Sequence, residues 1–282
     1  MKTSNRILLL GIIIIVYIYA HSITFIVNST IVGYNQYSGK TNEKLDSSIC
    51  INIEPFNKIR LDNSIGLFKI EQGEEYQIRF FNRYGESEEK LKKQFYVKNS
   101  ELFFYNYNAQ SSDAVLYKND FISIVTENMY PDLIITVPNL TNLSSNSNKV
   151  KFEGTNFESL VVQGNNMVFD FIDVTAKYLE LNMIKGLVRG NIDSEFVKMH
   201  VSFGEYSLEK CKARNADFFV DGYSLFKWGD VSDTLQLRIK NDCFLTFRKM
   251  PKHLIWNSNL YQESMWIMDR HGDYKRYTEY EF

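Results

Sequence analysis

The chain has 282 residues, and its 32 Lys and Arg against 34 Asp and Glu give a net charge of −2 at pH 7. This near balance provides no overall positive field, so we expect no nucleic-acid partner. The length allows one large domain or two modest ones, and the 15% of aromatic residues favours β-structure.

The first predicted element is a membrane-spanning helix over residues 7–27. As a helix these residues would rise about 31 Å at roughly 1.5 Å each, close to the hydrocarbon thickness of a bilayer. Lys2 and Arg6 precede the segment and the next basic residue is Lys40, which favours a cytoplasmic N-terminus and an exported body. We therefore predict that residues 1–27 form a short cytoplasmic tail and a signal anchor that holds a periplasmic body at the membrane.

A cleaved signal peptide is the alternative for the same segment. Cleavage after Ser22 fits, because Ala20 and Ser22 are both small, whereas cleavage after Ala20 would put Ile18 where a small residue is needed. No Cys lies near the end of the segment, which argues against a bacterial lipoprotein.

Residues 28–50 are polar and predict a linker, after which short β-rich runs begin. The charge-dense stretch 87–93 predicts a solvated loop or a short helix. The runs that predict strands are 59–62, 67–71, 76–81, 94–97, 102–107, 121–126 and 133–137.

The most regular part of the chain is a repeat of 19–20 residues between Phe157 and Phe247. Alternating apolar pairs recur in one phase, and three of the five residues inside the pairs are polar or charged, which predicts strands with one buried face. The pairs are Leu160/Val162, Leu179/Leu181, Met199/Val201, Phe218/Val220 and Leu237/Ile239. Turn residues follow most pairs, namely Gly164, Gly204, Gly222 and Asn241.

Two further apolar columns follow the pairs in each repeat. The columns are Met167, Leu187, Tyr206, Leu225, Phe244 and Ile172, Ile192, Cys211, Val231. Three short strands per repeat predict a right-handed parallel β-solenoid (β-helix) over residues 51–247, most regular in 157–247. A β-sandwich is the alternative, but it predicts no fixed phase. The periodicity ends after Phe247, so residues 248–282 are predicted to form a C-terminal cap or tail.

Three stretches together resemble a known family: residues 56–62 (Phe-Asn-Lys-Ile-Arg-Leu-Asp), 73–78 (Gly-Glu-Glu-Tyr-Gln-Ile) and 133–140 (Leu-Ile-Ile-Thr-Val-Pro-Asn-Leu). With the repeats that follow, residues 50–250 resemble the putative auto-transporter adhesin head GIN domain family of Bacteroidetes-type bacteria. The resemblance implies an exported β-solenoid of the cell envelope with no established enzymatic activity. The chain departs from the family in using Asn, Lys and bulky residues where Gly-Ser-Asp turns are typical, and in its anchor-like leader.

Motifs for catalysis or for binding a cofactor are absent from the sequence. The four His residues are not in a metal-ligand spacing, and no nucleophile elbow or P-loop occurs. Asp170 and Asp173 flank one predicted corner of the solenoid. In the enzymatic alternative, a polysaccharide lyase-like solenoid, they would be the cation ligands. Two carboxylates are too few for a calcium site, so we predict no catalytic, cofactor or metal residues.

The three cysteines are Cys50, Cys211 and Cys243, and none lies in a CxxC spacing. Cys211 lies in a core column and is expected to be a small buried hydrophobe. A disulfide between Cys211 and Cys243 is left open by the sequence.

Tyr223, Phe226 and Trp228 cluster where the fourth rung is expected to turn. Exposed aromatic side chains on a rigid face stack on sugars or insert into a protein, so we predict a ligand-contact surface for a glycan or an envelope protein. The alternative is that the three side chains pack against residues 248–282. The sequence thus predicts a membrane-anchored, non-enzymatic, adhesin-like envelope protein for binding or scaffolding. An envelope sensor is a further alternative, which would need a membrane partner because residues 1–6 are too short for an effector.

Overall fold

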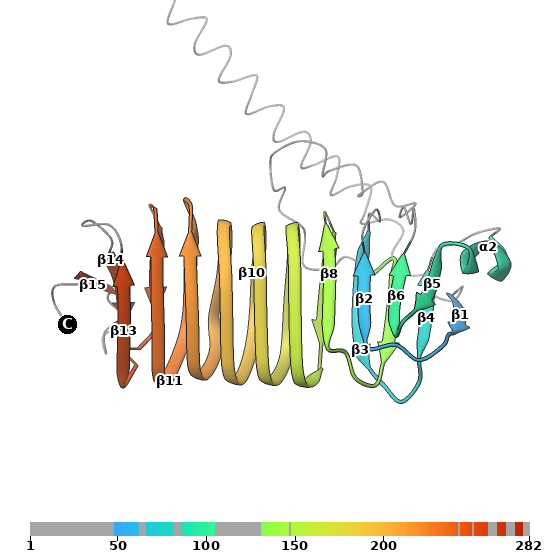
Figure 1. Ribbon diagram of the computed structural model, residues 1–282, viewed down its shortest axis with the longest axis horizontal. Helices are drawn as coiled ribbons and strands as arrows, with labels where there is room; N and C mark the ends of the chain where they lie inside the picture. Colours follow the sequence, from blue (N-terminus) through green and yellow to red (C-terminus); the bar gives the residue numbers. More distant parts are fainter. Residues whose placement is uncertain are drawn as a thin grey trace, which may run out of the picture. The chain divides into compact units, whose positions relative to one another are not determined.

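The computed structural model of the chain is mostly β-strand (Figure 1). The chain divides into two units after Ser47, and every described residue belongs to the second unit. The predicted anchor, most of the predicted linker and the predicted strand at 121–126 lie outside the described residues. Among the described residues no helix is long and apolar enough to cross a bilayer. The described residues are 48–61, 66–81, 86–104, 131–146, 148–241, 243–249, 251–258, 264–268 and 274–278.

The described strands join in one 15-stranded sheet of mixed, largely parallel pairing. Those of the N-terminal part are β1 (Ser48–Asn52), β2 (Lys58–Leu61), β3 (Leu67–Gln72), β4 (Gln77–Phe81), β5 (Phe95–Lys98), β6 (Glu101–Phe104), β7 (Leu133–Val137), β8 (Asn142–Asn146) and β9 (Lys149–Glu153). Those of the C-terminal part are β10 (Asn156–Asp221), β11 (Leu225–Lys240), β12 (Phe244–Phe247), β13 (His253–Ser258), β14 (Ser264–Met268) and β15 (Tyr274–Thr278).

The charge-dense stretch between β4 and β5 forms the short helix α2 (Glu88–Lys92). Ser87 caps its first turn, because the Ser87 side chain accepts a hydrogen bond from the Lys90 amide. The short-helix alternative for this stretch is therefore confirmed.

The chain winds turn upon turn through β10 and β11, and each turn, here called a rung, lies beside the next (Figure 1). The pairing is parallel with offsets of about one repeat, for example Phe218 with Leu237 and Leu143 with Val162, each 19 residues apart. All ten residues of the predicted apolar pairs are buried. The repeat and the inward face of the first strand are therefore confirmed.

The stack extends beyond the regular repeat in both directions. Towards the N-terminus, β8 pairs with β2 and β9 with β3, again in parallel. Towards the C-terminus, β13 pairs in parallel with β11 and β14 with β12, so that Leu237 lies opposite Trp256 and Leu245 opposite Met265. The prediction that the periodicity ends after Phe247 is therefore wrong for strand pairing.

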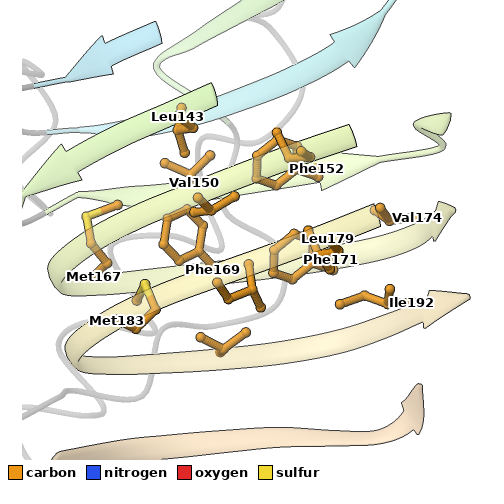
Figure 2. Close-up of a cluster of buried hydrophobic side chains, with 14 of the residues drawn as sticks. Leu143, Val150, Phe152, Met167, Phe169, Phe171, Val174, Leu179, Met183 and Ile192 are labelled. Atoms are coloured by element: carbon orange, nitrogen blue, oxygen red, sulfur yellow. The ribbon is translucent and has the colours of Figure 1, made fainter. Parts of the chain in front are cut away.

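Apolar side chains from successive rungs fill the interior of the stack. In Figure 2, Phe152, Phe169 and Phe171 point into the space enclosed by the ribbon, together with Met167 and Met183 from neighbouring turns. The rings of Phe152 and Phe171, from adjacent rungs, stack with centroids 5.2 Å apart. One rung cannot enclose such a core alone, so the stacking of rungs and the burial of the rings depend on each other.

The second predicted column is displaced by one residue in three of its five rungs. In the second rung Leu187 is half-buried and Val188 is buried. Leu225 is half-buried and Phe244 is exposed, whereas Phe226 and Leu245 are buried and lie opposite each other. A shift of one residue turns every side chain of a strand to the other face. In the third column Ile172 is likewise exposed, and Val174, two residues further on, is buried.

In each rung, the strand that carries the apolar pair is here called the first strand. A residue with positive φ marks the corner just after the first strand in five successive rungs. These residues are Asn166, Lys185, Phe203, Gly222 and Asn241, with φ between 51° and 65° and spacings of 19, 18, 19 and 19 residues. Of the predicted turn residues, Gly222 and Asn241 are therefore correct, while Gly164 and Gly204 lie elsewhere. A Cβ on Gly204 would come within 2.3 Å of the Gly186 carbonyl oxygen, so Gly204 instead permits close contact between two rungs.

Candidate ligand-binding surface

Only one of the three aromatic residues predicted to contact a ligand lies on the surface. Tyr223 is 77% exposed, whereas Phe226 and Trp228 are 0% and 1% exposed. Phe226 and Trp228 pack inside the stack against Phe218, with ring centroids 5.1 Å and 5.0 Å away, and Phe226 also contacts Phe247. The prediction of ligand contact is therefore wrong for Phe226 and Trp228. Among the described residues, their aromatic packing partners lie in the core of the stack.

Tyr223 belongs to a row of exposed apolar side chains that we call the apolar corner. It consists of Ile184, Phe203, Tyr223 and Phe244, which are 56%, 50%, 77% and 45% exposed. One comes from each of four successive rungs, and each lies within three residues of the positive-φ residue of its rung. Large exposed apolar side chains gathered in this way are typical of surfaces that bind another molecule.

Phe203 lies at the corner in a backbone conformation that a bulky residue rarely adopts. Its φ is 51°, and the left-handed region costs an L-residue roughly 1–2 kcal/mol. The Phe203 amide donates to the Gly222 carbonyl oxygen at 3.2 Å, and its ring lies so close to Gly222 that an added Cβ would be 2.6 Å from ring carbons. The next rung thus holds a half-exposed aromatic ring in a strained position, which is an observation that points to function.

The outward side of the first strands, between the corner and the strand starts, carries paired aromatic and charged groups. Tyr178 stacks on Phe196 with centroids 5.6 Å apart, and Phe219 lies between His200 and the Arg238 guanidinium. We call these five residues the aromatic face. Their contacts connect adjacent rungs, so the face is held in place by its own side chains.

Burial and a hydrogen bond change the acidity of one member of this face. Burial, followed by the hydrogen bond that the Tyr178 hydroxyl donates to Glu180 at 2.6 Å, raises the pKa of Tyr178 to about 12. Glu180 also accepts from Asn182 and pairs with Lys198. Tyr178 is therefore a neutral donor already committed to Glu180, and it has no role as a base.

A polar groove of about 490 Å³ runs along the opposite ends of the same strands. The groove is lined by three cationic and three anionic side chains. The lining residues are Asn156, Thr175, Ala176, Lys177, Asp193, Ser194, Glu195, Lys212, Ala213, Arg214, Asp230 and Ser232. The groove is open to solvent along much of its length, which does not favour chemistry that requires water to be excluded.

Asp170 and Asp173, the residues of the enzymatic alternative, are engaged in contacts within the chain. Asp170 is buried, and its carboxylate pairs with Arg189 and with Lys149, whose Nζ lies 3.1 Å from Oδ2. Burial lowers the pKa of Lys149, and the nearby Asp170 opposes this shift. Asp173 accepts a hydrogen bond from the Asn191 side chain at 2.6 Å. Asp170 thus bridges neighbouring rungs, and neither residue belongs to the groove.

Histidines and cysteines form no site in the described part of the chain, where no group of three or more His, Cys, Asp and Glu side chains comes together. His200 is exposed, as predicted, and His21 and His271 lie outside the described residues. None of the three cysteines forms a disulfide with another described residue. Cys211 is buried, as expected, and burial raises the pKa of its thiol to about 12, so it is not a nucleophile.

Comparison with known proteins gives likenesses in structure and none in sequence. No protein-family model and no functionally curated protein matches the chain. A putative adhesin from Bacteroides fragilis NCTC 9343 is similar over 75% of this chain and 92% of its own, with a TM-score of 0.54 and 14% identity. The chain shares the fold of that protein.

Two further solved structures are similar at lower TM-scores. One is a putative lipid binding protein from Parabacteroides distasonis ATCC 8503, with a TM-score of 0.41 and 14% identity over 76% of this chain and 94% of its own. The other is a putative adhesin from Parabacteroides merdae ATCC 43184, with a TM-score of 0.40 and 12% identity over 77% and 95%. Membership of the GIN domain family stays a prediction.

The sequence gives little signal for the two surfaces that the fold creates. Ile184, Phe203 and Phe244 each stand in a different repeat, and none is a residue type that signals a turn. The groove combines short polar segments from five rungs whose members are up to 76 residues apart, from Asn156 to Ser232. Either surface could be found only by aligning all the repeats at their corner positions.

Proposed function

We propose that the chain is a non-enzymatic, adhesin-like protein of the cell envelope that holds a partner protein on its apolar corner. The carrying observation is the strained, half-exposed Phe203 in a row with Ile184, Tyr223 and Phe244. In this proposal the stack is a right-handed β-solenoid of the auto-transporter adhesin head GIN domain type.

The chemistry of the corner favours a protein partner over a sugar. Aliphatic Ile184 stands at one end of the row and three rings follow it, and such a mixture fits apolar side chains that insert between its members. Large aromatic side chains with few rotatable bonds are typical anchors of protein interfaces. Because hydrogen bonds between rungs already hold the backbone, little further ordering is needed on binding.

The lyase-like alternative has lost the residues that motivated it. Asp170 is committed to Arg189 and Lys149, and Asp173 to Asn191. Acid–base catalysis needs a group placed next to a reacting atom in a cleft. We therefore propose binding as the function of the described part of the chain.

Photocrosslinking from the corner tests the proposed binding. A photoreactive phenylalanine analogue is placed at Phe203 or at Tyr223, and as a control at Glu209, which is exposed on the second strand of its rung. We expect an adduct of one discrete mass from Phe203 and Tyr223 in intact cells of the producing bacterium, and none from Glu209. Equal adduct patterns from all three positions would contradict a specific partner at the corner.

Replacing Phe203 with glycine is expected to separate binding from stability. Glycine adopts φ near 51° without a steric penalty, so the free energy of unfolding should stay level or rise by about 1 kcal/mol. The corner adduct formed from Tyr223 should meanwhile decrease strongly. Urea denaturation followed by circular dichroism measures the first effect.

Gly222→Ala is the matched control for Phe203→Gly, because it changes the glycine that the Phe203 ring contacts. It places a methyl group 2.6 Å from the Phe203 ring in a left-handed backbone, and should lower the free energy of unfolding. A Phe203→Gly variant that is clearly destabilised would mean that the ring serves packing alone.

We also propose that residues 7–27 anchor the body outside the cytoplasm, on the basis of their apolar run and of Lys2 and Arg6 before it. The chain should then sediment with the inner membrane and be digested by protease added to spheroplasts. Amino-terminal sequencing of the mature protein provides the decisive check. A mature N-terminus between residues 21 and 23 would rule out the anchor.

A further inference from the structure

We propose that the polar groove binds a linear, uncharged glycan that lies extended along the direction in which the rungs stack. The groove lies at the opposite ends of the first strands from the apolar corner. It is therefore a second site, and the proposal goes beyond binding of a protein at the corner.

The shape of the groove follows from one short segment contributed by each of five rungs. Asn156, Thr175, Asp193, Lys212 and Asp230 each belong to a different rung and all line it. Adjacent strands are about 4.8 Å apart, so five rungs present polar groups over about 19 Å. A ligand made of repeated units can meet equivalent groups from rung to rung.

Small side chains make the floor of the groove. Ala176, Ser194 and Ala213 come from three successive rungs, line the groove and are buried. Larger side chains at these positions would project into the space, so the concavity depends on this column. The groove is thus built by the same repeat that builds the core.

The balance of charge selects the class of ligand. Lys177, Lys212 and Arg214 face the groove together with Asp193, Glu195 and Asp230, so the charges sum to zero. Such a site exerts no net attraction on an acidic polysaccharide or a nucleic acid. It does offer acceptors and donors side by side, and a sugar hydroxyl can donate to one and accept from the other.

Asp230 lines the groove but is already engaged within the chain. Its Oδ2 pairs with Lys249 Nζ at 3.2 Å, and its Oδ1 is buried and so lies out of reach of a ligand in the groove. The acceptors open to a sugar hydroxyl are the exposed carboxylates of Asp193 and Glu195.

An extended peptide fits the groove less well than a glycan. Peptides that bind along a sheet pair with a free strand edge and place side chains in apolar pockets. Here Lys212 and Ala213 are already paired with Asp230 and Val231 of the next rung. Among the described residues that line the groove, only Ala176 and Ala213 are of apolar type, and these small side chains provide no pocket for a side chain.

Calorimetric titration of the full chain with neutral oligosaccharides tests the proposal. The probes are cello-oligosaccharides and β-1,3-glucan oligosaccharides from disaccharide to octasaccharide, with oligogalacturonate as the acidic comparison. We expect affinity for one neutral series to rise with length and then level off once all five rungs are engaged. Oligogalacturonate should bind more weakly at every length.

Paired substitutions locate the site. Asp193→Ala with Glu195→Ala should weaken binding by about tenfold, because two acceptors are lost. Glu205→Ala with Glu209→Ala removes the same charge from exposed positions outside the groove and should leave affinity unchanged. Circular dichroism checks that both variants keep the β-structure.

Three results would overturn the proposal. They are no binding of either neutral series, tighter binding of oligogalacturonate, and a loss of binding in Tyr223→Ala but not in the Asp193/Glu195 variant. The last result would assign the glycan to the apolar corner. If photocrosslinking from Phe203 and Tyr223 gave no discrete adduct while glycan binding was intact, only the proposed protein partner would be contradicted.

Discussion

Replacing Leu181 with aspartate is expected to destabilise the stack by several kcal/mol and to abolish its cooperative unfolding at ordinary temperature. Leu181 is fully buried, and a carboxylate there would have no partner in an interior made of apolar side chains. Val201 is equally buried and should behave in the same way. The measurement is urea denaturation of the full chain, followed by circular dichroism in the β-sheet band.

His200→Ala is the matched control, because His200 is adjacent to Val201 in the chain but points outward, where its ring meets Phe219 edge-on. It should change the free energy of unfolding by no more than about 0.5 kcal/mol. Glu180 also points outward, but it accepts hydrogen bonds from Tyr178 and Asn182, so it is a less clean control. Equal sensitivity at Leu181 and His200 would show that the register is wrong.

Phe226→Ala is expected to cost about 3–5 kcal/mol of stability, which is the usual range for removing a buried aromatic ring. Phe226 lies within contact distance of Tyr206, Phe218, Trp228 and Phe247, so its removal leaves a cavity lined by rings. The midpoint of urea denaturation should fall accordingly, and Trp228→Ala should have an effect of the same order.

Tyr223→Ala, three residues away, provides the contrast. Tyr223 is exposed and should contribute little to stability, so its replacement should leave the unfolding midpoint almost unchanged. If Phe226→Ala were as harmless as Tyr223→Ala, the phase of the fourth rung would have to be shifted by one residue.

The first strand of each rung was predictable because its apolar pair recurs in one phase, and in three of the five rungs a polar or charged residue lies between the two members. In Leu179-Glu180-Leu181 a charged residue separates two apolar ones, so only one face can be buried. The second strand contains adjacent apolar residues, such as Leu225 with Phe226 and Phe244 with Leu245. There the pattern fits either phase, and only packing against neighbouring rungs decides between them.

The same ambiguity explains why Phe226 and Trp228 were wrongly predicted to contact a ligand. With Leu225 assigned to the core, the alternation puts Phe226 and Trp228 on the surface. The structure buries both and leaves Tyr223 at the corner. The corner itself was hard to see, because Phe203 and Lys185 occupy left-handed positions where glycine or asparagine is the usual sign of a turn.

The pairing of β13 and β14 was missed for a different reason. The segment His253–Ser258 has few apolar residues in alternation, so its sequence pattern is weak. Its place in the stack rests on backbone pairing with β11, which does not depend on side-chain type, and on Leu254 and Trp256, which pack partly buried against the core. A rung of this kind can only be found once the rung beneath it is known.

The antiparallel strands at the ends of the described sheet affect end-to-end association between copies of the chain at high concentration. A parallel stack is in principle open-ended, since the last rung of one copy presents the same hydrogen-bonding pattern that the first rung of another would need. Here β1 and β4 near one end, β5 on the other ladder of that end and β15 at the far end all pair antiparallel to their neighbours. The outermost strands at these places therefore run against the winding direction of the stack, and a rung of another copy would meet them antiparallel instead of continuing the parallel ladder. On these ladders such ends disfavour head-to-tail growth into fibres.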